Sequence, residues 1–190
     1  MRKNKAVLLT ISVMLLLFCF CSCVSLSKKE NEPFAYLTNT SRFILLPTGA
    51  IEKSMDMAQC ISASYQDNNF LMIAWVKADE TAVEMTLLNE MGTNIGELSY
   101  RGRTIAFSSQ VFPDLIRPEY IIADFQLCFY DTSLLTQALK NCGLVMEING
   151  TAKRILKGKE LIYEIERNLE AIRLVNHLRR YTYTLEGDFS

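Results

Sequence analysis

The chain has 190 residues, of which 49% are hydrophobic and 22% are charged, and its formal net charge is −1. This length fits one ordinary domain that can bury a real core. Residues 1–22 carry +3, so the rest of the chain is near −4. A mildly acidic surface argues against nucleic acid, which attracts clustered lysine and arginine, so we expect no nucleic-acid partner.

The N-terminus has the layout of a secretory signal peptide. Positive charges in residues 1–5 precede an uncharged apolar run over residues 6–20. Cleavage needs a small side chain just before the cut. Of the three cysteines in the stretch FCFCSC, only Cys23 follows a small residue, Ser22. We therefore predict that residues 1–22 are the signal peptide and that Cys23 is the first mature residue.

This junction resembles the lipobox of bacterial lipoproteins, in which the cysteine receives a diacylglycerol. The lipobox usually has a leucine three residues before the cysteine and a small residue two before it. In this chain those positions hold Phe20 and Cys21. Ser25 is not the aspartate associated with inner-membrane retention, so the resemblance implies a lipid anchor on the periplasmic face of the outer membrane, with inner-membrane anchoring as the alternative. An alternative interpretation is that residues 6–27 stay uncleaved and anchor the chain in the membrane, since a span needs roughly 20 apolar residues. A metal site at the three cysteines is less favoured, because the segment has no partner histidine or cysteine at zinc-like spacing.

The rest of the chain divides into a tether and one domain. Residues 23–40 are polar and contain Pro33, which predicts a flexible tether. Residues 41–190 form the single domain. Its cysteines are odd in number and too sparse for a disulfide scaffold. We expect Cys60, Cys128 and Cys142 to be buried among apolar side chains. The sequence leaves open whether Cys128 and Cys142 form a disulfide bridge.

Short β-rich runs separated by turn residues fill the first part of the domain. In one of them, residues 82–88, Val83, Met85 and Leu87 alternate with polar residues, which predicts one buried face and one wet face. Such runs, joined by tight turns, predict an antiparallel meander. The predicted strands are 42–46, 57–65, 70–77, 82–88, 95–100 and 104–112.

Two helices are predicted next. Pro118 and Glu119 suit a first helical turn, and that helix runs to Tyr130 with an apolar face of Ile121, Ile122, Phe125 and Cys128. Residues 131–133 supply a cap for a second helix, which ends at Gly143. Its apolar stripe is Leu134, Leu135, Ala138, Leu139 and Cys142.

Strands resume after the second helix, and Asn149-Gly150 is a strong hairpin signal. Six strands, two amphipathic helices and about five further strands predict an α+β fold. We expect a curved antiparallel half-barrel sheet whose concave face is covered by both helices. The predicted later strands are 144–148, 151–157, 160–166, 171–175 and 180–185.

No catalytic constellation stands out in the sequence. The nucleophile elbow, the HExxH zinc motif and the P-loop do not occur. The single histidine, His177, lies in the polar stretch NHLRRY and is expected at the surface. Glu164 and Glu166 share a face of a predicted strand, but hydrolysis would need a pocket and separated pKa values. We expect a non-enzymatic protein with no cofactor and no metal.

The stretch RPEYIIADFQLCFYDTSLLTQAL, residues 117–139, resembles a family of small bacterial lipoproteins of undetermined function, and ADFQL is its most characteristic piece. AKRILKGKELIYEIE (152–166), LVN (174–176) and YTYTL (181–185) extend the resemblance. The family is similar to the outer-membrane receptor LolB and the periplasmic carrier LolA, and members often sit in gene clusters for aryl-polyene or related lipid-like synthesis. The resemblance implies a half-barrel with a helical lid over an apolar cavity that binds acyl chains, and no catalytic residue.

The expected function is a lipid-anchored protein that binds a hydrophobic or acylated ligand and exchanges it with a periplasmic carrier protein. The alternative is a structural or assembly lipoprotein that binds a partner protein. An empty cavity would favour the first, and a filled core with an exposed apolar patch the second. In the first helix, Asp124 and Gln126 would bond a headgroup or face water. The candidate cavity residues, each with an ordinary filled core as the competing interpretation, are Met72, Trp75, Phe107, Ile121, Phe125 and Leu135.

Overall fold

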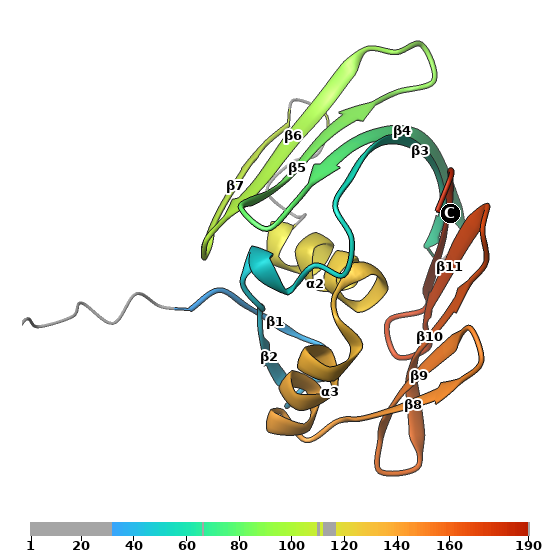
Figure 1. Cartoon of the computed structure of the whole chain (residues 1–190). Coiled ribbons are helices and arrows are strands. Elements are labelled where there is room, and N and C mark those ends of the chain that lie inside the picture. The colour runs from blue at the N-terminus through green and yellow to red at the C-terminus, as the bar shows by residue number, and fades with distance from the viewer. Residues whose placement is uncertain (1–31, 66, 110, 112–116, 190) are drawn as a thin grey trace, which may run out of the picture. The chain divides into compact units, whose positions relative to one another are not determined.

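The computed structural model describes residues 32–65, 67–109, 111 and 117–189. The predicted signal peptide and Cys23 lie outside the described residues. The described chain forms a curved, unclosed antiparallel sheet with two helices on its concave side (Figure 1), which confirms the predicted α+β half-barrel. In this part of the chain no helix is long and apolar enough to cross a membrane.

Ten strands make up the main sheet, in the order β7-β6-β5-β4-β3-β12-β11-β10-β9-β8. One meander comprises β3 (Met55–Tyr65), β4 (Asn68–Ala78), β5 (Ala82–Leu88), β6 (Asn94–Arg101) and β7 (Thr104–Ser108). The other comprises β8 (Val145–Asn149), β9 (Ala152–Lys157), β10 (Glu160–Arg167), β11 (Ala171–Asn176) and β12 (Tyr181–Glu186). The two meanders join where β12 pairs with β3, from Tyr181 opposite Tyr65 to Glu186 opposite Cys60.

The strands separate a buried concave face from a wetter convex face. In β5 the alternation predicted from the sequence is confirmed, because Val83, Met85 and Leu87 are buried while Glu84 and Thr86 are half-buried. The apolar set packs against the helices, so the core lies inside the curve of the sheet.

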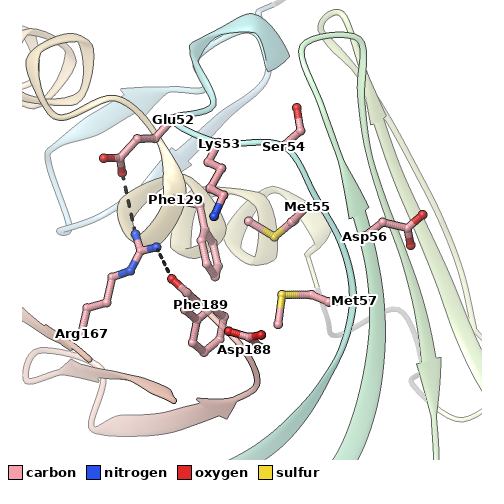
Figure 2. A pocket seen from close by; sticks show the side chains of 10 residues that line it. All are labelled: Glu52, Lys53, Ser54, Met55, Asp56, Met57, Phe129, Arg167, Asp188 and Phe189. Carbon is pink, nitrogen blue, oxygen red and sulfur yellow. Dashed lines mark hydrogen bonds and ion pairs between the residues drawn. The ribbon is translucent and has the colours of Figure 1, made fainter. Parts of the chain in front are cut away.

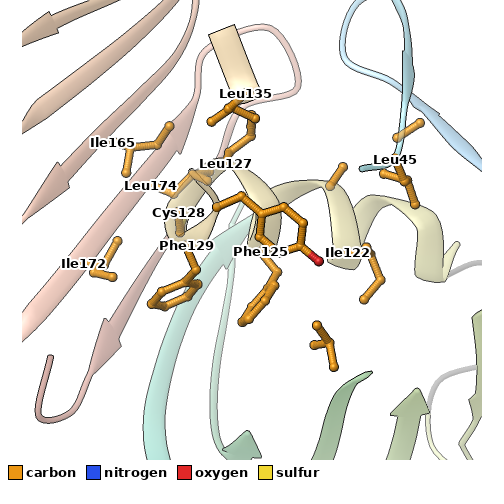
Figure 3. Close-up of a cluster of buried hydrophobic side chains, with 14 of the residues drawn as sticks. Leu45, Ile122, Phe125, Leu127, Cys128, Phe129, Leu135, Ile165, Ile172 and Leu174 are labelled. Carbon is orange, nitrogen blue, oxygen red and sulfur yellow. The ribbon is translucent and has the colours of Figure 1, made fainter. Parts of the chain in front are cut away.

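The first helix, α2 (Pro118–Phe129), is buried on every side over most of its length. The prediction of a single apolar face is therefore wrong for residues 122–129, all of which are buried. The cause is that α2 contacts β1 and β7 as well as lying inside the sheet. Figure 3 shows its side chains at the centre of the core, between Leu45 and Leu135 and the sheet residues Ile165, Ile172 and Leu174.

The second helix, α3 (Thr132–Asn141), begins as predicted. The Asp131 side chain accepts hydrogen bonds from the backbone N–H groups of Ser133 and Leu134, at 3.0 and 2.9 Å, and so caps the helix. The predicted stripe is only partly buried, because Leu135 is fully buried whereas Leu134 is 49% exposed. Helix α3 thus presents a narrower apolar face than the sequence predicts.

The end of the predicted tether is part of the fold. Strand β1 (Phe34–Tyr36) pairs with β2 (Arg42–Ile44), and Ala35 and Leu37 are buried. The tether prediction for residues 23–40 is therefore wrong from residue 34 onward, because these apolar side chains pack against the core. Two predicted strands are shorter than expected, since β2 ends at Ile44 and β7 at Ser108.

Candidate functional site

A pocket of about 270 Å³ opens between the start of β3, the end of α2 and the C-terminal segment (Figure 2). Small-molecule sites commonly measure about 300–1,000 Å³, so this volume suits part of a ligand rather than a large molecule. Met55, Met57, Phe129 and Phe189 give the pocket its apolar surface. The polar residues that line it are Glu52, Lys53, Ser54, Asp56, Arg167 and Asp188.

The C-terminal segment is held against this pocket by several contacts. The Phe189 N–H donates to the Leu169 carbonyl at 2.9 Å, and its ring lies 5.9 Å from that of Phe129. Arg167 donates to the Phe189 carbonyl at 3.5 Å and forms an ion pair with Glu52 at 3.7 Å. At Gly187 a Cβ would lie 2.6 Å from the Met57 Cε, so glycine allows the segment to approach the pocket wall closely.

A strip of partly exposed side chains continues along the concave face of β3, β4 and β12. We call it the concave strip: Met55, Met57, Ile61, Met72, Tyr181 and Tyr183. It leads toward Tyr65 and Phe70, each 47% exposed, at the far end of the β3–β4 hairpin. The concave face is therefore not fully covered, and an apolar surface remains open to solvent beside α2.

Polar groups lie against one end of this strip. Tyr163, Asn176 and Tyr181 occupy directly opposed positions on β10, β11 and β12, which places them in one row on the concave face. The Tyr181 hydroxyl donates a hydrogen bond of 2.7 Å to Asp124 Oδ2 from α2. Burial raises the pKa of Asp124 to about 7, against the lowering effects of the Tyr181 hydrogen bond and the Arg179 charge.

The other buried titratable groups near α2 are not set up as nucleophiles. Burial raises the pKa of the Cys128 thiol to about 12, so it is protonated at neutral pH. Burial lowers the pKa of Lys153, whose Nζ donates to the Leu127 carbonyl at 3.4 Å. Cys60 and Cys142 are free thiols, as is Cys128, so the Cys128–Cys142 bridge left open by the sequence is not formed. In the described ranges no group of three acidic, histidine or cysteine residues is placed to hold a metal ion.

The structure disperses the six candidate cavity residues. Phe125 and Leu135 are buried in the core, Met72 belongs to the concave strip, and Phe107 and Ile121 are half-buried against the core. Trp75 is 52% exposed on the convex face, where its Nε1 donates to Asp56 at 2.9 Å.

For Trp75 the cavity expectation is wrong. Alternate residues of β4 face opposite sides of the sheet, and its buried neighbours Ala74 and Val76 take the core side. The sequence analysis also missed Met55, Met57 and Phe189. The alternation of apolar and polar residues in MDMAQ predicts that the two methionines share one face of a strand. No local pattern predicts that Phe189 packs beside them.

The expectation that Gln126 meets a headgroup or water is also wrong. Its side chain is fully buried, accepts from the Leu46 N–H at 2.9 Å and donates to the Leu46 carbonyl at 2.8 Å. The Tyr100 hydroxyl donates to the same carbonyl at 2.8 Å. Gln126 therefore fixes the segment after β2 to α2. His177 is exposed and lies 3.9 Å from Glu164, which pairs with Arg154 at 2.8 Å.

A comparison with known families gives a match over most of the chain. The model of a family described as "Protein of unknown function (DUF3261)" matches residues 56–187. This range contains both helices and all ten strands of the main sheet apart from Met55. No curated protein matches the chain.

Proposed function

We propose a function for this chain on the premise that it belongs to the DUF3261 family, whose function is unknown. The chain is a non-enzymatic lipoprotein, anchored through Cys23 on the periplasmic face of the outer membrane. It binds or carries a lipid-like ligand or an acylated protein, and exchanges it with a periplasmic carrier protein. The unclosed antiparallel sheet with two helices on its concave side is the architecture that the sequence resemblance to LolA and LolB implies, and it supports this proposal.

The observation that carries the proposal is the continuity of the pocket with the concave strip. Met55 and Met57 belong to both, and Met72 lies on the neighbouring strand. Each methylene of an acyl chain gains about 0.8 kcal/mol on burial, so a chain along the strip gains several kcal/mol. Methionine side chains adapt to chains of different shape, which suits a carrier.

A second candidate function, binding of a partner protein, is favoured by a different observation. Helix α2 fills much of the concave side, and two large apolar side chains are exposed on the same face at the end of the β3–β4 hairpin, Tyr65 and Phe70. Exposed apolar clusters often mark protein interfaces.

The test is a native mass spectrum of the purified chain before and after extraction with organic solvent. A releasable lipid-range mass supports the carrier. A clean protein mass, with no uptake of added acyl ligands, supports the partner-binding candidate.

A matched pair of variants locates the ligand. Met57→Asp places a charge in the pocket wall and should abolish acyl binding, because a carboxylate is costly to bury beside an alkyl chain. Met91→Asp makes the same change at a position 88% exposed and should leave binding intact. Equal binding by both variants would move the ligand away from the pocket.

A further inference from the structure

Several buried polar groups beside the concave strip lack partners. Together with Tyr181, whose hydroxyl bonds Asp124, they form what we call the polar cluster: Asp124, Tyr163, Asn176, Arg179 and Tyr181. Among the described residues no hydrogen bond is made by Asp124 Oδ1, the Tyr163 hydroxyl, Asn176 Nδ2 or Arg179 Nε. Tyr163 and Asn176 are fully buried, and Asp124 is 7% exposed. Buried polar atoms are nearly always paired, so this concentration of unpaired atoms calls for a group that satisfies them.

The other polar atoms of these side chains already make hydrogen bonds or ring contacts. Asn176 Oδ1 accepts from the Arg179 N–H at 2.8 Å, and the Arg179 guanidinium packs 4.7 Å over the Tyr120 ring and donates to the Tyr36 carbonyl. The Tyr181 hydroxyl is used by Asp124 Oδ2. What remains without a hydrogen-bond partner in the described part of the chain is one acceptor, Asp124 Oδ1, and three donors, the Tyr163 hydroxyl, Asn176 Nδ2 and Arg179 Nε.

This pattern matches a hydroxyl group. A hydroxyl donates one hydrogen bond and accepts two, so it can donate to Asp124 Oδ1 while it accepts from Tyr163 and Asn176. An unsubstituted alkyl chain can do neither. Binding sites are typically apolar with a few placed polar groups that fix specificity, and the cluster shares Tyr181 with the concave strip.

We propose that the polar cluster binds a hydroxyl group of the ligand that lies along the concave strip, so that the protein selects hydroxylated acyl compounds over plain ones. The inference rests on the proposed function. The hydroxyl belongs either to the acyl chain itself or to a headgroup such as glycerol.

The experiment measures competition for the purified full chain by native mass spectrometry, in two arms. One arm compares 16-hydroxyhexadecanoate with hexadecanoate, and the other compares monopalmitoylglycerol with methyl hexadecanoate. One additional hydrogen bond in the complex corresponds to a preference of about fivefold or more. Preference in the first arm identifies a chain hydroxyl, and preference in the second identifies a headgroup hydroxyl.

Variants connect the preference to the cluster. Asp124→Leu should abolish it, and Tyr163→Phe, which keeps the ring and removes an unpaired hydroxyl, should reduce it about fivefold. The matched control is Tyr130→Phe. The Tyr130 hydroxyl is also buried and unpaired, yet it lies by Gln126 and Tyr100 outside the cluster. Thermal unfolding will show whether Asp124→Leu folds. If it does not, the preference measured for Tyr163→Phe still tests whether the cluster binds the hydroxyl.

The outcomes separate the two proposals. Equal binding within both pairs would overturn the hydroxyl site and leave the lipid carrier standing. No binding of any of the four compounds would overturn both. If Tyr163→Phe keeps the preference for the hydroxylated compound as fully as Tyr130→Phe does, the polar cluster is not the site that binds the hydroxyl.

Discussion

Replacing Asp124 with asparagine should flatten the pH dependence of the chain's stability between pH 5 and pH 8. In the folded chain the pKa of Asp124 is about 7, against 3.8 for the free carboxyl. The fold therefore binds the proton more tightly than the unfolded chain does between these two values. The free energy of unfolding falls as pH rises from about 4 to about 7, and is level above that.

The size of the effect follows from the shift. A difference of about 3 pKa units, at about 1.4 kcal/mol per unit, is about 4 kcal/mol, of which about 3 kcal/mol falls between pH 5 and pH 8. The groups facing the carboxyl are the hydroxyls of Tyr163, Tyr181 and Tyr183 from the sheet and the Arg179 charge, all of which lower its pKa less than burial raises it. On its own helix it faces Cys128.

The assay is urea unfolding of the wild type and Asp124→Asn at a series of pH values. Asparagine keeps an oxygen that accepts from Tyr181 but has no charge to bury, so the variant should gain relative to the wild type as pH rises. All other titrating groups are common to both chains and cancel in the difference. A difference that stays constant from pH 5 to pH 8 would refute the reasoning.

Three further predictions concern other residues. Gln126→Leu removes both side-chain hydrogen bonds to Leu46 and should lower the free energy of unfolding by about 2 kcal/mol in a urea titration, because the N–H of the half-buried Leu46 loses its partner; a loss below about 0.5 kcal/mol would contradict this. Asp131→Ala removes the cap of α3 and should cost about 1 kcal/mol in the same assay, whereas Asp131→Asn should cost less. Cys23→Ser should abolish incorporation of labelled palmitate and release the chain from the membrane fraction; continued labelling would exclude Cys23 as the acylated residue.

Local patterns predicted most of the strands and both helices. Turn residues such as Asn149-Gly150 mark the hairpins directly, and Asp131 identifies the start of α3 through its own hydrogen bonds. Strand β1 was missed because Pro33 and the polar residues around it resemble a linker. Only its pairing with β2 and the burial of Ala35 make it part of the fold.

The site was harder to predict than the elements, because it depends on which strands become neighbours. Residues 70–77 are almost entirely apolar, so no alternation reveals which face Trp75 takes. In α2 the run around Asp124 and Gln126 is nearly all apolar, which is typical of a helix buried on every side. The burial of these two polar side chains could therefore be predicted from the sequence. Tyr163, Asn176 and Tyr181 meet only through long-range pairing, which no local pattern encodes.

The pairing of β3 with β12 at the centre of the sheet has a consequence for folding. Each meander consists of hairpins that form from residues close in sequence, but the bond between the halves joins residues 60–65 to residues 181–186. Loop closure over such a separation is slow. Until β12 arrives, the backbone edge of β3 is an open template for another chain. We therefore expect the two halves to form early and their joining to limit the folding rate, with aggregation as the competing fate of the half-joined chain.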